Sequence, residues 1–317
     1  MNAGNTSSKK GTYFTTGKNI DKHAFNTMKV NTNIIHTKVN FDHGRYLSLL
    51  ISDIHFDNPK CRRDILKNHL ETAVERGAKI RINGDFFCIM QGKYDKRASK
   101  DQLRPEHVGP NYFDLVVDEA IEWFKPFAHH IEWISYGNHE TSVLKRNEID
   151  VLKRFVDGIN AKTGSSIKLG GYGGWECFSV SKGGRSTKFN LKYMHGFGGG
   201  GPVTKGTIQH SRMQTMVNNA DVVWMGHVHE LYIMASVKES AHFGKSLHIR
   251  HDVSWDIRTP TYKDEFIDGS HGWHIERGAP PKIIGGIWMD MGWKRIQRGG
   301  DDVMVSDFVF SPCVGYI

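Results

Sequence analysis

Cysteine is scarce in this sequence, and no two cysteines form a C-x-x-C pair. That spacing argues against a zinc ribbon or a redox dithiol. Isolated thiols fit a reducing compartment, and we therefore expect a cytoplasmic protein. The four cysteines are Cys61, Cys88, Cys177 and Cys313.

Long apolar runs are also missing. No stretch reaches the roughly 18 apolar residues that a transmembrane helix needs. The N-terminal segment MNAGNTSSKKGTYFTTGKNIDKH is polar and lacks the apolar core of a signal peptide. We therefore expect no membrane partner, and we see no internal repeat at a fixed period.

Acidic residues are fewer than basic ones, with 34 Asp and Glu against 42 Lys and Arg, which gives a formal net charge of +8. Such a charge favours anionic partners, among them nucleic acid and phosphate esters. The basic residues begin near the N-terminus, where we predict a flexible basic tail over residues 1–30.

Apolar patterns with strand and helix periods alternate along the middle of the chain. Helical spacing covers residues 62–76, 112–124 and 141–158, the last with Thr141 as its expected cap. Beyond residue 230 the pattern changes to strands, loops and many Gly and Trp residues. The predicted strands are residues 46–56, 78–87, 130–140, 220–230, a pair over 176–194, and two more at 231–238 and 246–255.

Metal-ligating residue types follow these apolar runs in five short clusters. In open α/β sheets, ligands bind beyond the carboxyl ends of the strands. One His or Asp at such a place is usually an ordinary satisfied polar residue, but the whole ordered set predicts a site for two metal ions. The clusters are Asp53 and His55 in SDIH, Asp85 in NGD, Asn138 and His139 in GNHE, His195 in MHG, and His227 and His229 in GHVH.

The order of the five clusters resembles the calcineurin-like metallophosphoesterase superfamily, whose consensus is D-x-H, G-D, G-N-H-[DE], H-G and G-H-x-H. The resemblance covers residues from about 46 to 230. It implies an α/β fold, an αββα sandwich of two sheets flanked by helices, over residues 31–317. Residues 231–317 would be a β-rich part of the same domain that completes the second sheet.

The resemblance also implies a role for each residue. Asp85 would bridge two divalent metal ions, and His139 would face the substrate and donate a proton to the leaving group. The ligand types suit Mn²⁺, Fe²⁺, Zn²⁺ or Ni²⁺, of which we predict Mn²⁺. Hydroxide generated at the metals would then hydrolyse a phosphate ester. The remaining ligands would be Asp53, His55 and His229 on one metal, and Asn138, His195 and His227 on the other.

The chain departs from some branches of that superfamily after Gly84-Asp85, where Phe86, Phe87 and Cys88 follow. Purple acid phosphatases place a metal-binding Tyr where Cys88 stands, so we do not expect an iron–tyrosinate centre. The V-D-R-G continuation of Ser/Thr protein phosphatases is absent as well. We interpret Cys88 as a core thiol.

A surplus segment at residues 90–111 lies between the second and third clusters and is rich in basic side chains. Such a loop could hold a phosphate backbone, although Asp95, Asp101 and Glu106 also fit an ordinary solvated loop. We predict a phosphodiesterase or nuclease acting on DNA, RNA or nucleotides. The alternatives are a phosphomonoesterase on a protein or small metabolite, and an inactive scaffold. The predicted substrate contacts are Lys93, Lys96, Arg97 and Lys100.

Overall fold

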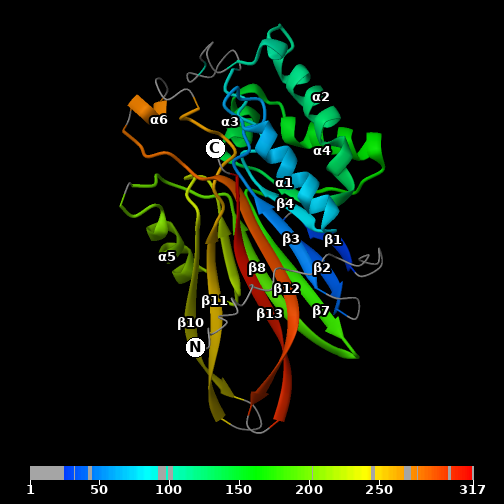
Figure 1. Cartoon of the computed structure of the whole chain (residues 1–317), viewed down its shortest axis with the longest axis vertical. Helices are drawn as coiled ribbons and strands as arrows, with labels where there is room; N and C mark the ends of the chain where they lie inside the picture. Colours follow the sequence, from blue (N-terminus) through cyan, green and yellow to red (C-terminus); the bar gives the residue numbers. More distant parts are fainter. Residues whose placement is uncertain are drawn as a thin grey trace, which may run out of the picture.

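The computed structural model describes residues 25–31, 33–41, 45–91, 98, 103–201, 203–243, 247–267, 273–276, 278–298 and 301–315. These residues form two mixed β-sheets with helices on their outer faces (Figure 1). A mixed α/β fold with two sheets is therefore confirmed. In the part of the chain described, no helix has the length and apolarity to cross a membrane.

One sheet has six strands in the order β13-β12-β3-β4-β5-β6. Its central strands run parallel and are buried on both faces, which explains why the sequence shows continuous apolar runs there. The strands are β3 (Tyr46–Ile51), β4 (Lys79–Asn83), β5 (Ile131–Ser135), β6 (Lys168–Leu169), β12 (Ile284–Arg298) and β13 (Asp301–Gly315).

The other sheet has seven strands in the order β1-β2-β7-β8-β9-β11-β10. Strand β7 alternates between buried and partly exposed residues, as expected when only one face packs on the core. The strands are β1 (Phe25–Asn31), β2 (Ile34–Asn40), β7 (Gly173–Lys182), β8 (Arg185–Met194), β9 (Val222–Met225), β10 (Tyr232–Phe243) and β11 (Leu247–Arg258).

Helices cover both outer faces, so the layers follow the order helix, sheet, sheet, helix. One core cluster joins α1, α2 and α4 to β3, β4 and β5, and a second fills the space between the sheets. Helix α5 packs its Met213 against Val223 and Met225 on the far face of the seven-stranded sheet. The helices are α1 (Arg63–Glu75), α2 (Tyr112–Phe124), α3 (Asn138–Asn147), α4 (Val151–Thr163), α5 (Thr207–Met216) and α6 (Trp273–Glu276).

The segment predicted as one helix over 141–158 is two helices in the structure. Helix α3 begins at Asn138 rather than after Thr141, because the Glu140 carboxylate accepts the Gly137 backbone N–H at 2.8 Å. It ends at Asn147, where the C-cap residue Glu148 has a left-handed backbone. Helix α4 starts after Asp150, whose side chain accepts a hydrogen bond from Lys153 N at 2.9 Å. The predicted cap at Thr141 was wrong, since the true start lies inside the GNHE cluster.

The sequence predicts a flexible tail over residues 1–30, but the last residues of this range belong to a strand in the structure. Residues 25–31 form β1, which pairs antiparallel with β2. Apolar alternation could not reveal this edge strand, because Met28 and Val30 are exposed while Thr27 is buried. Residues 1–24 lie outside the described residues.

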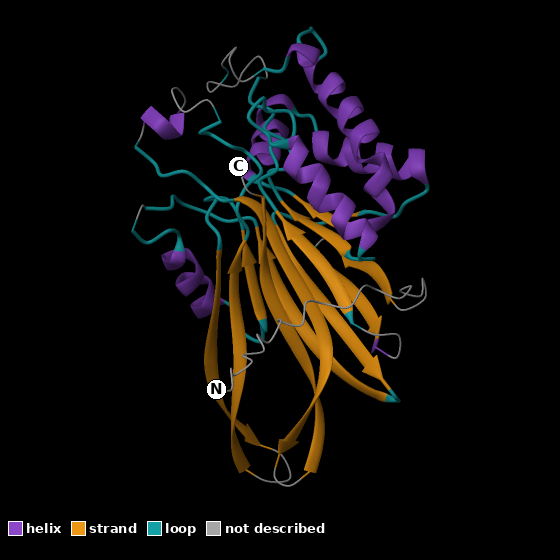
Figure 2. Ribbon diagram, viewed as in Figure 1, coloured by secondary structure: helices purple, strands orange, loops and turns teal. Residues whose placement is uncertain are grey.

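The C-terminal strands divide between the two sheets, whereas the sequence analysis predicts that they complete the second one. The β10–β11 ribbon extends the seven-stranded sheet beside β9, whereas the β12–β13 ribbon extends the six-stranded sheet beside β3. Both ribbons run away from the helices at the top of the view and form the opposite end of the molecule (Figure 2). On the first ribbon, Val237, Phe243 and Leu247 are exposed to solvent.

A buried ion pair joins the two sheets. Arg81 on β4 contacts both carboxylate oxygens of Glu176 on β7 at 2.6 Å, and both side chains are 0% exposed. Thr37 and Trp133 donate two further hydrogen bonds to Glu176. Arg81 also donates to Tyr46 and Ser48, so the network leaves neither charge without partners.

We predict that Glu176→Gln destabilises the protein by about 3–5 kcal/mol, because Arg81 would remain buried without a counter-charge. Urea unfolding followed by circular dichroism measures the loss. Asp114→Asn, which breaks an exposed ion pair with Arg154, is the matched control and should cost little. Similar losses in the two variants would contradict a special role for the buried pair.

Candidate metal centre

The residues of all five clusters meet at one edge of the two sheets. Three clusters follow the parallel strands β3, β4 and β5, and two follow the parallel strands β8 and β9. Parallel strands end at the same edge, so residues more than 170 positions apart become neighbours; His227 N, for example, lies 3.0 Å from Asp53 Oδ2.

Asp53, His55 and His229 form the first group of side chains that could hold a metal ion. The Nε2 atoms of His55 and His229 lie 3.3 Å apart, and His229 Nε2 lies 3.4 Å from Asp53 Oδ1. Asp53 is fully buried and His55 almost so. This is the set that the resemblance assigns to one metal.

Asp85, His195 and His227 form the second group, and Asn138 adjoins it. His195 Nε2 lies 3.1 Å from Asp85 Oδ2 and 3.2 Å from Asn138 Oδ1. The same nitrogen lies 3.9 Å from Asp53 Oδ1, so the two groups share one compact centre.

The hydrogen bonds of the imidazole rings show which nitrogens are available to a cation. His195 Nδ1 lies 2.8 Å from Asn83 O, a carbonyl that can only accept, so the proton sits on Nδ1. In the neutral ring, Nε2 then directs a lone pair at the oxygens of Asp85 and Asn138. A metal cation between these atoms would satisfy all three, as would a proton on Nε2, and the outer hydrogen bond is typical of metal-ligating histidines.

His227 also has one ring nitrogen available to a cation, but here it is Nδ1 rather than Nε2. Its Nε2 lies 3.0 Å from Gly198 O and must donate there, which leaves the lone pair on Nδ1. That Nδ1 is buried and has no hydrogen-bond partner among the described residues, and the same holds for Nδ1 of His55. Buried nitrogens of this kind fit a metal site.

The electrostatics of the centre favour positive charge. Burial alone would raise the pKa of both carboxyl groups, but nearby His195 brings the pKa of Asp53 below its usual value and that of Asp85 well below it. Conversely, burial would lower the pKa of His195, yet Asp85 and Asp53 raise it to about 10. Burial and His139 keep the pKa of His55 well below its usual range, so that ring is neutral.

Five of the candidate ligands have left-handed backbones, which are uncommon outside glycine. Each such residue costs of order 1–3 kcal/mol and persists only where its surroundings enforce it. Hydrogen bonds between the two loops do so here, from Asp53 N to Gly84 O and from His55 N to Asp85 O, each 3.0 Å. The five φ values are 51° at Asp53, 50° at His55, 48° at Asp85, 74° at His227 and 59° at His229.

The carboxylates of Asp85 and Asp53 lie so close to the backbone of two clusters that only glycine fits there. A Cβ at Gly137 would lie 2.1 Å from Asp85 Oδ1, and one at Gly226 would lie 2.6 Å from Asp53 Oδ2. Any larger residue would push the carboxylates from their positions. The glycines therefore give the side chains room to converge.

Glu140 also contacts the loops of the centre, a role that its place in GNHE did not reveal. Its carboxylate accepts the backbone N–H groups of Gly137 at 2.8 Å, Phe87 at 2.9 Å and Asp85 at 3.2 Å. Burial and the charge of Asp85 raise its pKa to about 8, against the effect of these amide donors. Glu140 thus joins the loop after β4 to the loop after β5.

The last residue of β11 and the segment after it also support the centre, although the sequence indicated no role for them. Arg258 Nη1 donates to Gly226 O at 3.0 Å, and Thr261 Oγ1 donates to Asp53 O at 2.8 Å. These contacts hold the backbone on which His227 and Asp53 sit. Sequence reasoning missed them because neither residue lies in a recognisable motif.

Cys88 lies beside the centre, with its sulfur near His55 and His139. Burial raises the pKa of its thiol to about 12, which favours the protonated thiol. Asn58 Nδ2 donates to the sulfur at 3.3 Å. This environment agrees with the interpretation of Cys88 as a core thiol.

The predicted substrate contacts at Lys93, Lys96, Arg97 and Lys100 lie outside the described residues. Comparison of the chain with models of known protein families gave no match, and comparison with curated proteins gave none either.

We predict that Gly226→Ala lowers the metal content of the protein after reconstitution with Mn²⁺, because the new methyl group collides with Ser52 and Asp53. Gly199→Ala is the control, since a Cβ there meets nothing within 4 Å. Elemental analysis gives the metal content, and circular dichroism checks that both variants are folded. Full metal occupancy in folded Gly226→Ala would show that the Asp53 carboxylate is not needed as a ligand.

Proposed function

We propose that the chain is a binuclear, metal-dependent phosphoesterase whose substrates are phosphodiesters of nucleic acid or nucleotides. The observation that carries this proposal is the position of His195 Nε2, 3.1 Å from Asp85 Oδ2 and 3.2 Å from Asn138 Oδ1, beside a second group of candidate ligands. A pair of adjacent cation sites suits in-line displacement at phosphorus.

The donor set divides into two sites with a shared carboxylate. Asp53, His55 and His229 would hold one cation and Asn138, His195 and His227 the other, with Asp85 between them. When bound, the two cations would offset the charge of the phosphate and make a water molecule more acidic. Neutral imidazoles and an amide oxygen keep the site from accumulating too much negative charge.

His139 is suited to move a proton rather than to bind metal. Its Nδ1 lies 2.6 Å from Cys88 O and donates to it, which leaves Nε2 directed toward the centre, 3.8 Å from Asp85 Oδ2. The side chain keeps 12% of its surface exposed, so a substrate can reach it. In its protonated form, His139 would give a proton to the leaving oxygen.

The substrate class rests on charge. The net charge of +8 and the basic surplus at 90–111 favour a polyanion over a neutral or acidic protein surface. A phosphomonoesterase would use the same centre, so the two activities have to be separated by experiment.

Removal and return of metal test the proposal. Chelated protein should be inactive, and Mn²⁺ should restore activity with close to two ions per chain, because two donor groups are present. Hydrolysis of bis-p-nitrophenyl phosphate should exceed that of p-nitrophenyl phosphate. Asp85→Asn should lower turnover by at least about a hundredfold, with partial loss of metal. Activity that survives complete chelation would refute the proposal, and a preference for the monoester would identify a phosphomonoesterase.

His139→Ala should keep the metal content of the wild type while kcat for the diester falls by about 10²–10⁴-fold, the usual contribution of a proton donor. A substrate with a better leaving group should lose less, since it needs the proton less. His251→Ala, at an exposed position on β11, serves as the control. Loss of metal with unchanged activity per bound ion would assign His139 to the ligands instead.

A further inference from the structure

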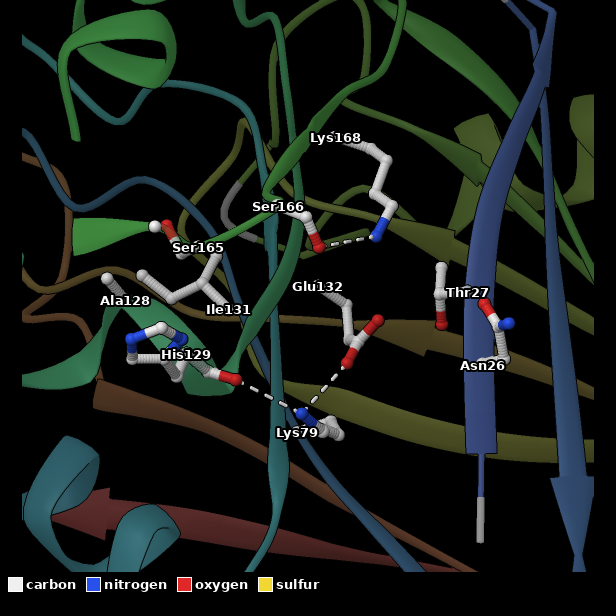
Figure 3. A pocket seen from close by; sticks show the side chains of 11 residues that line it. Asn26, Thr27, Lys79, Ala128, His129, Ile131, Glu132, Ser165, Ser166 and Lys168 are labelled. Atoms are coloured by element: carbon white, nitrogen blue, oxygen red, sulfur yellow. Dashed lines mark hydrogen bonds and ion pairs between the residues drawn. The ribbon is translucent and has the colours of Figure 1, made fainter. Parts of the chain in front are cut away.

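A polar cavity of about 460 Å³ lies at the opposite end of β4 and β5 from the metal centre. Lys79 at the start of β4, Glu132 on β5 and Lys168 at the start of β6 line it, and Figure 3 shows these three side chains between β1 and the segment of Ser165 and Ser166. Its volume lies within the range of small-molecule sites, about 300–1,000 Å³.

Two lysines and one glutamate line the cavity, so one positive charge has no matching carboxylate there. Lys79 Nζ lies 3.1 Å from Glu132 Oε1 and donates to His129 O at 3.1 Å, so this lysine is paired. Lys168 Nζ has no carboxylate within ion-pair distance among the described residues and donates to Ser166 Oγ at 3.2 Å. The excess charge therefore resides on Lys168.

Lys168 is in a place where a free ammonium is costly. The side chain is partly buried, and this burial lowers its pKa; Glu132 opposes that effect and Lys79 adds to it. An ammonium group has three N–H donors, of which one has a partner among the residues that the structure describes. An oxyanion in the cavity would accept the others and neutralise the charge.

The walls of the cavity are fixed by hydrogen bonds that do not involve Lys168. Lys29 on β1 donates to Leu169 O at 2.6 Å, across the gap between β1 and β6. Asn160 Oδ1 accepts from Ser165 Oγ and from Ile167 N, each at 2.8 Å, and so shapes the segment before Lys168. A site held in this way loses little entropy when a ligand binds.

We propose that this cavity binds a small ligand through a phosphate or carboxylate group, which the Lys168 ammonium and the Ser166 hydroxyl hold. Its position beyond the amino ends of β4 and β5 separates it from the metal centre, so the site does not depend on the proposed phosphoesterase activity. The paired Lys79 and Glu132 form the opposite wall and are suited to polar groups on the rest of the ligand.

Isothermal titration calorimetry of the metal-loaded protein with inorganic phosphate, and separately with acetate, tests the site and distinguishes the two oxyanions. The dissociation constant should rise by about tenfold or more in Lys168→Gln, because a charge-assisted hydrogen bond is lost. Lys192→Gln is the matched control: that lysine is also partly buried, but it lies over Trp175 on another strand. It should bind like the wild type.

Phosphate can also bind at a metal centre, so Asp85→Asn separates the two sites. Binding that persists in Asp85→Asn and weakens in Lys168→Gln supports the cavity, whatever the outcome for phosphoesterase activity. The proposal is overturned if neither anion binds at millimolar concentration, if Lys168→Gln and Lys192→Gln behave alike, or if Asp85→Asn alone abolishes binding.

Discussion

Two buried carboxylates, Asp53 and Asp85, have to be balanced by positive charge, and the edge of the sheets is arranged around this constraint. An unpaired ion in the interior costs several kcal/mol even after the protein relaxes. His195 supplies part of the balance, since the two carboxylates raise its pKa to about 10. A proton on one imidazole balances only one of the two charges, whereas a pair of divalent cations would balance both and satisfy the lone pairs of the surrounding histidines.

Holding these groups together has a conformational cost, which the rest of the fold offsets. Five candidate ligands keep left-handed backbones, and the loops that carry them come from both sheets. The centre therefore survives only if the sheets keep their relative position. The buried contact between Arg81 and Glu176 and the apolar cluster between the sheets fix that position. Backbone strain of this kind concentrates where function needs a defined geometry.

The structure brings together the seven residues that the sequence predicts as metal ligands, because each cluster is local: a ligand type directly follows an apolar strand. Helix α2 was equally readable from its apolar spacing. Contacts between distant segments could not be predicted from the sequence. The role of Glu140 depends on N–H groups of two other loops, and that of Arg258 on a carbonyl 32 residues away. The sheet that β12 joins is decided by its pairing with β3, which no local pattern encodes.

Strand β4 shows how one short segment serves several of these needs. Ile80 and Ile82 enter the core beneath the helices, while the alternate residues are polar. Arg81 joins the sheets, Asn83 accepts a hydrogen bond from His195 through its carbonyl oxygen, and Asp85 follows as a candidate ligand. Successive side chains of a strand point to opposite faces, so a register shift of one residue would exchange the two sets. It would place Arg81 in the apolar core and an isoleucine in the network between the sheets, so the register of β4 holds both the core and this network in place.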